Sequence, residues 1–123
     1  LYNNVSVFNG ASIGENNIIF PGAVISAAPQ DLKYAGEYTE AYIGNNNTLR
    51  ECVTVSRSTN QEKATQIKDN CLFMAYAHVA HDCSIGNNCI LANSVALGGH
   101  VLLEDFVRPW PGCRRKRRHS CVH

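Results

Sequence analysis

Three of the five histidines of this 123-residue chain fall between His78 and His100, among residues that could assist acyl transfer. Asp82 follows His81 directly, and Gly99 precedes His100. Histidine titrates near neutral pH and can remove a proton from an alcohol, while a neighbouring carboxylate can orient the imidazole. A glycine amide can donate to a developing oxyanion. These residue types indicate general-base chemistry in which a substrate hydroxyl attacks an acyl group.

A six-residue period runs through the chain and must position these side chains. An amphipathic helix would need apolar residues at i, i+3, i+4 and i+7, and a strand would alternate by two, so neither explains it. The period is typical of a parallel β-helix, in which each hexad supplies one strand and one turn. We therefore expect an all-β fold with three hexads in each triangular coil. The inward-pointing positions are predicted to be Leu1, Val7, Ile13, Ile19, Ile25, Ile43, Leu49, Val55, Ile67, Phe73, Val79, Ile85, Leu91, Leu97 and Leu103.

Small residues recur four positions after most of these apolar ones, which fits a narrow interior. Cys71, Cys83 and Cys89 occupy this phase. A cysteine in phase with a repeat is more often a small buried apolar residue than half of a disulfide, so we expect reduced thiols and a cytoplasmic protein. Turns of Gly-Asn-Asn at 44–46 and 86–88 can supply the corners of the coils.

Two polar interruptions, at 26–42 and 56–66, break the period and are expected to be loops expelled from the coil. The period ends after residue 106, which divides the chain into a partial β-helix domain, 1–106, and a tail, 107–123. The first piece carries five basic and ten acidic residues, whereas the second carries six basic residues and no acidic one. We interpret the tail as the product of a shifted reading frame. The alternatives are a disordered end, or a segment that binds nucleic acid or an acidic partner or directs localisation.

The chain opens at Leu1, already in repeat phase and without a methionine, so we expect truncation at both ends. No apolar run approaches the roughly 18 residues that span a membrane, and no secretory signal is visible. Glycine-rich phosphate loops and paired catalytic carboxylates are also absent from the sequence.

The length of the coil predicts which side chains meet. Gly99 follows His81 by three hexads, and His100 follows Asp82 by the same interval. Each pair should therefore stack in adjacent coils, about 5 Å apart. His78 lies before the intervening corner. The patch offers no nucleophile, because Cys83 should point inward, so direct attack by the substrate hydroxyl is favoured.

Four segments of the chain resemble a known family. They read APQDLKYAGE at 28–37, LRECVTV at 49–55, AHVAHDC at 77–83 and CILANSVALGGH at 89–100. Together with the hexads they are similar to the UDP-N-acetylglucosamine O-acyltransferases, hexapeptide-repeat enzymes of left-handed parallel β-helix fold that begin lipid A biosynthesis. The sister N-acyltransferases have His-Asn at the catalytic position, so Asp82 favours the O-acyltransferases.

The resemblance implies transfer of a 3-hydroxyacyl chain from acyl carrier protein to the 3-hydroxyl of UDP-N-acetylglucosamine. The enzyme would be a cytoplasmic homotrimer with its site between subunits, using neither a cofactor nor a metal and binding no nucleic acid. By position, His81 would be the general base, Asp82 its partner and Gly99 the amide donor to the oxyanion. The substrate-binding residues would be Gln30, Asp31, Lys33, His78 and His100.

The sequence departs from the family pattern in places. Ser56-Arg57-Ser58 stands where the family often has His-Arg-Gly. The coils expected after residue 106 are missing, with a further histidine, the acyl-chain ruler and the helical region, so the fragment itself could be inactive.

Two other functions fit the same pattern. His78, His81 and His100 could ligate zinc with a water as fourth ligand, as in a carbonic-anhydrase-like group of this fold. Alternatively, the chain could be a β-solenoid scaffold without catalysis, because a repeat specifies a scaffold and not an activity.

Overall fold

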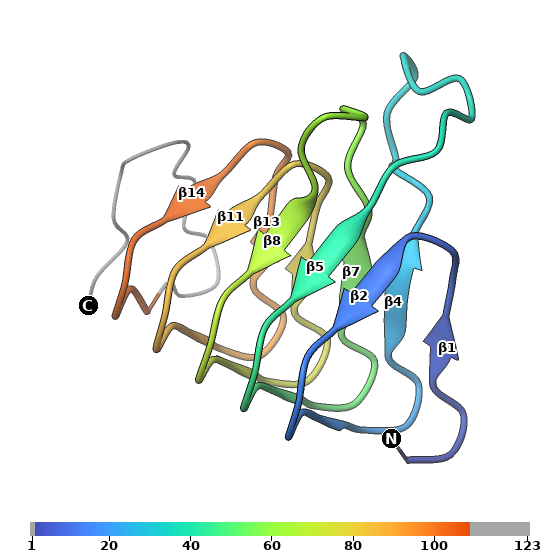
Figure 1. Cartoon of the computed structure of the whole chain (residues 1–123). Coiled ribbons are helices and arrows are strands. Elements are labelled where there is room, and N and C mark those ends of the chain that lie inside the picture. Colours follow the sequence, from blue (N-terminus) through green and yellow to red (C-terminus); the bar gives the residue numbers. More distant parts are fainter. Residues whose placement is uncertain (1, 109–123) are drawn as a thin grey trace.

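The computed structural model describes residues 2–108, which wind into a stack of β-coils (Figure 1). No helix in this part of the chain is long and apolar enough to cross a membrane. The strands are β1 (Ser6–Val7), β2 (Ala11–Ile13), β3 (Ile18–Ile19), β4 (Val24–Ala27), β5 (Ala41–Ile43), β6 (Thr48–Leu49), β7 (Thr54–Ser56), β8 (Thr65–Ile67), β9 (Leu72–Phe73), β10 (His78–Val79), β11 (Ser84–Ile85), β12 (Ile90–Leu91), β13 (Ala96–Leu97) and β14 (Leu102–Leu103).

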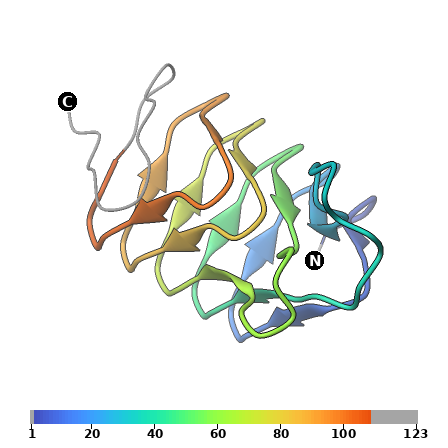
Figure 2. The same ribbon diagram turned by 90° about the horizontal axis from the view of Figure 1, so that it is seen from above.

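Successive coils place their strands in three parallel sheets, so that every third strand is a neighbour in space (Figure 2). The sheet orders are β1-β4-β7-β10-β13, β2-β5-β8-β11-β14 and β3-β6-β9-β12. In the uninterrupted coils, His78 lies opposite Ala96 and Ser84 lies opposite Leu102, so that paired residues are three hexads apart in both cases. The all-β architecture and the three-hexad coil predicted from the sequence are therefore confirmed.

The corners of the coils are made by residues in the left-handed backbone region. One corner column contains Asn16, Asn46, Asn70 and Asn88, with φ between 59° and 61°, and ends at Phe106, with φ of 65°. Asparagine tolerates this region better than most residues, which explains its recurrence at the turns. A second column contains Asp82 and His100, both with φ of 62°. Two of the residues singled out for chemistry thus also form a corner.

The interior is a continuous apolar column, because the inward residue of each hexad stacks on its counterpart in the next coil. The side chains at the predicted inward-pointing positions are buried from Ile19 to Leu103. The small-residue positions are buried from Ala23 to Val95, including Cys71, Cys83 and Cys89, and the cysteines of the described chain are free thiols. Val7 differs from the prediction and is 43% exposed, because β1 lies at the edge of its sheet.

Asparagine side chains also join the coils. Asn47 is fully buried; its side chain accepts a hydrogen bond from the Cys71 N–H at 2.8 Å and donates one to the Lys68 carbonyl at 2.8 Å. Its own N–H donates to the Asn17 side chain at 2.9 Å. These bonds satisfy backbone groups that the narrow interior would otherwise leave without partners.

Both predicted interruptions are loops, and they project from the same edge of the stack (Figure 1). Their bounds are narrower than predicted, at 28–40 and 57–64, because β4, β5, β7 and β8 reach further into them. Ser26, expected in the first loop, is fully buried within β4, where the pairing with β7 shifts register. The loops are thus anchored by strands on either side.

The coil continues slightly past the predicted domain boundary at residue 106. Val107 is buried, and its carbonyl accepts a hydrogen bond from the Ile90 N–H at 3.2 Å. Arg108 is exposed. The remainder of the tail predicted at 107–123 lies outside the described residues.

Candidate active site

The corner between β10 and β11 brings together the residues that the three-hexad coil predicted to meet. Gly99 lies directly against the His81 ring, with no room for a Cβ between them. The His100 N–H donates to the His81 carbonyl at 3.1 Å. Adjacent coils therefore stack glycine on imidazole at this corner, as the spacing predicted.

His81 and Asp82 form a hydrogen-bonded pair. Nδ1 of His81 lies 2.9 Å from Oδ2 of Asp82. A carboxylate can only accept a hydrogen bond, so it fixes the proton on Nδ1 and leaves the lone pair on Nε2. Nε2 is also one of the ring atoms closest to Gly99. The edge of the ring that carries Cε1 and Nε2 thus lies against Gly99.

Asp82 is held by more than the histidine. Oγ1 of Thr59 donates to its Oδ2 at 2.6 Å, and the Thr59 N–H approaches both carboxylate oxygens, at 3.1 and 3.2 Å. The Asp82 N–H donates to Oγ1 of Thr65 at 2.9 Å. Burial alone would raise the pKa of the Asp82 carboxyl, but hydrogen bonds from Thr59 and His81 outweigh it and hold that pKa below its ordinary value.

His100 lies on the open side of this pair. Its Nε2 is 3.7 Å from Oδ2 of Asp82, and its ring meets the His81 ring edge to face, with centroids 5.2 Å apart. The His100 side chain is 67% exposed, against 14% for His81. The second imidazole is therefore free to contact a substrate while the first is held in place.

His78 is turned toward a different partner. Its Nδ1 lies 2.6 Å from Oγ1 of Thr54 in the neighbouring strand. Burial, and to a lesser degree the charge of His81, lowers the pKa of His78. The donor atoms of His81, Asp82 and His100 lie within 4.8 Å of one another, but this group does not include His78. Within the described chain, the three histidines considered from the sequence as zinc ligands are therefore not gathered into one group.

The first loop brings one of its three predicted residues to the corner. Oδ2 of Asp31 lies 4.0 Å from Nε2 of His81, and its other oxygen accepts the Lys33 N–H at 3.0 Å. Gln30 and Lys33 are exposed. The loop thus places a carboxylate beside the basic nitrogen, with Gln30 and Lys33 at the protein surface.

Cys83 follows the dyad in sequence but faces the interior. It is almost fully buried, and this burial raises the pKa of its thiol to about 11. A buried neutral thiol is a poor nucleophile. The position of Cys83 therefore agrees with direct attack by a substrate hydroxyl.

The second loop contributes two residues that the sequence did not single out. One is Thr59, described above. The other is Arg57, which donates to the Ser26 carbonyl at 2.8 Å and to the Tyr34 hydroxyl at 3.3 Å, with its guanidinium over the Tyr34 ring. These contacts join residues far apart in the chain and come from loops, so the six-residue period gives no signal for them.

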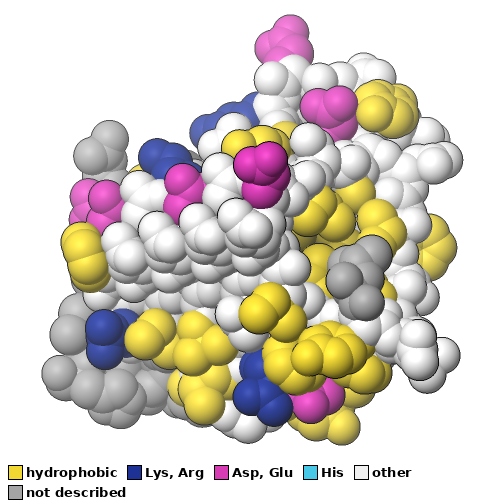
Figure 3. All heavy atoms as spheres, turned by 60° about the horizontal axis from the view of Figure 1, so that its bottom comes forward, with side chains coloured by type: hydrophobic (Ala, Val, Ile, Leu, Met, Phe, Trp, Pro, Cys, Tyr) yellow, Lys and Arg dark blue, Asp and Glu magenta, His cyan; other side chains and the backbone are white. Residues whose placement is uncertain are grey.

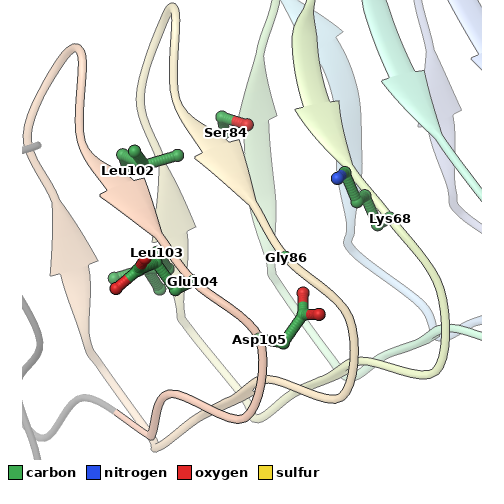
Figure 4. Close-up of a pocket in the computed structure, with 7 residues that line it drawn as sticks. All are labelled: Lys68, Ser84, Gly86, Leu102, Leu103, Glu104 and Asp105. Carbon is green, nitrogen blue, oxygen red and sulfur yellow. The ribbon is translucent and has the colours of Figure 1, made fainter. Parts of the chain in front are cut away.

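Two other surface features lie apart from this corner. Figure 3 shows a band of hydrophobic side chains on a face where no histidine is visible. A hollow of about 470 Å³ lies beside β8, β11 and β14 (Figure 4). It is lined by Lys68, Ser84, Gly86, Leu102, Leu103, Glu104 and Asp105. The lining includes none of the predicted site residues, so this hollow lies apart from the His81 corner.

Comparison with known proteins supports the same fold. A family model described as bacterial transferase hexapeptide (six repeats) matches residues 64–99. The acyl-(acyl-carrier-protein)–UDP-N-acetylglucosamine O-acyltransferase of Synechocystis sp. is 53% identical over 104 residues, which cover 85% of this chain and 38% of the relative. The enzyme of the same name from Thermodesulfovibrio yellowstonii is 50% identical over 107 residues, 86% of this chain and 42% of the relative.

Among solved structures, a UDP-N-acetylglucosamine acyltransferase from Bacteroides fragilis matches with a TM-score of 0.84 and 46% identity. The match covers 87% of this chain and 42% of that structure. The chain thus belongs to the left-handed β-helix proteins built from hexapeptide repeats. More narrowly, the matched residues are homologous to the UDP-N-acetylglucosamine O-acyltransferases, which confirms the resemblance. The matches span only 38% and 42% of the length of the two curated relatives.

Proposed function

We propose that the protein transfers a 3-hydroxyacyl chain from acyl carrier protein to the 3-hydroxyl of UDP-N-acetylglucosamine, the first step of lipid A biosynthesis. The observation that carries this proposal is the His81–Asp82 pair, with Gly99 against the ring and Asp31 beside Nε2. The pair occurs in a chain that is about half identical to enzymes named for this reaction.

In the proposed reaction, Nε2 of His81 removes the proton of the sugar hydroxyl as its oxygen attacks the thioester carbonyl. Asp82 stabilises the imidazolium that forms. The amide of Gly99 donates to the oxyanion of the tetrahedral intermediate. The intermediate collapses, the carrier-protein thiolate leaves, and it takes the proton from His81. His100 and Asp31 contact the sugar nucleotide, together with His78, Gln30 and Lys33.

We also propose that the working unit is a cytoplasmic homotrimer with each site between two subunits. The exposed His100 ring supports this, because one subunit offers an open face on which a second could complete the cleft. In the O-acyltransferase family, which the chain resembles, the cleft lies between adjacent subunits.

The test is acylation of UDP-N-acetylglucosamine by 3-hydroxyacyl carrier protein, measured with the full-length gene product. Replacing His81 with alanine should lower kcat about 10²–10⁴-fold, the usual contribution of a general base. The exposed Asn93 provides a control, since N93A changes a different corner. Unchanged turnover in H81A, in a variant with wild-type thermal unfolding, would show that His81 is not the base.

A further inference from the structure

We propose that Thr59 is a positioning residue, which fixes the Asp82 carboxylate so that its Oδ2 faces Nδ1 of His81. This inference extends the proposed function and relies on it for its kinetic test. It concerns a residue in the second loop, a segment for which the sequence predicted no role at the site.

The contacts of Asp82 show why it needs such a partner. Oδ2 of Asp82 lies 2.9 Å from Nδ1 of His81 and accepts a hydrogen bond from the Thr59 hydroxyl at 2.6 Å. Nε2 of His100 lies 3.7 Å from the same oxygen. A carboxylate on a freely rotating side chain would exchange its two oxygens among these donors. The Thr59 N–H reaches both oxygens and the hydroxyl reaches one, so the plane of the carboxylate is fixed.

Thr59 can fix its partner because it is itself held. Ser58, which precedes it, is fully buried; its N–H donates to the Glu40 carbonyl at 3.1 Å and its hydroxyl to the Asn60 carbonyl at 3.0 Å. On the other side, the Asp82 backbone is tied to Thr65 at the loop's end. Both partners of the Thr59–Asp82 contact are therefore anchored, and the N–H groups of Ser58 and Thr65 share the Glu40 carbonyl as acceptor.

The orientation of the Asp82 carboxylate affects the chemistry because it determines the tautomer of His81. An anionic, correctly oriented Oδ2 holds the proton on Nδ1 and leaves Nε2 basic. If the carboxylate turned, Nδ1 would lose its acceptor, and a fraction of His81 would carry its proton on Nε2 instead. That fraction could not act as a base. Thr59 thus affects turnover without touching substrate.

The experiment compares T59V, which removes only the hydroxyl, with T59S, which keeps it. T48V in β6, on a different sheet, is the control for loss of a threonine hydroxyl. We expect T59V to lower kcat by about 10–100-fold, as a misplaced catalytic group does, with KM for UDP-N-acetylglucosamine changed less than about twofold. T59S should restore most of kcat, and T48V should match the wild type.

A second measurement does not depend on the reaction. Long-range ¹H–¹⁵N spectra of protein with ¹⁵N-labelled histidine show which nitrogen of His81 carries the proton. We expect the Nδ1–H tautomer in the wild type and in T59S, and a mixture in T59V. A wild-type tautomer in T59V, or equal kcat defects in T59V and T59S, would overturn the role of Thr59. Absence of acyl transfer in the wild type would count against the proposed function, while the tautomer would still test Thr59.

Discussion

The Cα of Gly99 faces the His81 ring so closely that a Cβ built there would lie 2.6 Å from Nε2. This separation is shorter than real Cβ contacts allow, so any side chain at this position must displace the ring. The neighbouring Gly98 differs: no atom lies within 4 Å of the corresponding position. Two adjacent glycines thus have different surroundings, and of the two only Gly99 packs against the His81 ring.

The first prediction follows from this contrast. Gly99→Ala should push the His81 ring away from its hydrogen bond with Asp82 and lower kcat about 10²-fold. Gly98→Ala should leave kcat near the wild-type value, because its methyl group meets open space. Steady-state acylation assays on both variants test the prediction. Equal activity in the two would mean that the His81 ring is not held where the structure places it.

The second prediction concerns acid stability. The fold lowers the pKa of His78, so its neutral form stabilises the folded state in full above the unfolded value of about 6.5. This stabilisation is lost as the pH falls through the unfolded value toward the folded one. The wild type should therefore lose more free energy of unfolding than His78→Asn between pH 7.5 and 5.5. Urea unfolding at several pH values measures both slopes, and identical slopes would contradict the prediction.

The third prediction concerns the contact between the two loops. Arg57 joins Ser26 in β4, just before the first loop, to Tyr34 within that loop, which also carries Asp31. Arg57→Ala should loosen the loop and raise KM for UDP-N-acetylglucosamine about tenfold, with a smaller effect on kcat. Arg50→Ala is the matched control, because that guanidinium packs over Phe20 and not over a loop. A similar KM in the two variants would exclude the loop contact as a determinant of binding.

The fourth prediction concerns the buried asparagine that joins three coils. Asn47→Ala would leave the Cys71 N–H and the Lys68 carbonyl without their partners inside the stack. Each unsatisfied buried group costs about 1–3 kcal/mol, so the variant should lose about 2–4 kcal/mol of unfolding free energy in urea. Asn93→Ala, at an exposed position, should change stability by less than about 0.5 kcal/mol. Comparable losses in both variants would show that burial of Asn47 is not what matters.

The sequence predicted the corner of the site because the hexads run without interruption from His78 to His100. In that stretch, residues that are three hexads apart stack in adjacent coils. This spacing correctly predicted that Gly99 lies against His81 and that His100 lies near Asp82. The three-hexad spacing was enough to predict these contacts because the β-helix repeats the same local geometry in each coil.

The same rule could not place the loop residues. Thr59 and Arg57 reach their partners through loop conformations that no period governs, and the tight Thr59–Asp82 contact appears only in three dimensions. The rotation of His78 toward Thr54 was also missed, because spacing fixes where a Cα lies and not which partner the ring selects. For the same reason Asp31 approaches His81 whereas Lys33 does not.

Asp82 and His100 both have left-handed backbone torsions, and this restricts which amino acids the corner can accept. Besides glycine, the residues that adopt such torsions most readily are asparagine, aspartate and histidine. Two of these carry a carboxylate or an imidazole, the groups that proton transfer requires. The residues that favour this backbone conformation therefore overlap with the residues that can transfer protons. Other corners of the stack hold Cys52, Tyr76 and Ser94 in the same region. A saturation library at these two positions should therefore be enriched in this short list for folding without being limited to it, and should return a narrower subset for activity.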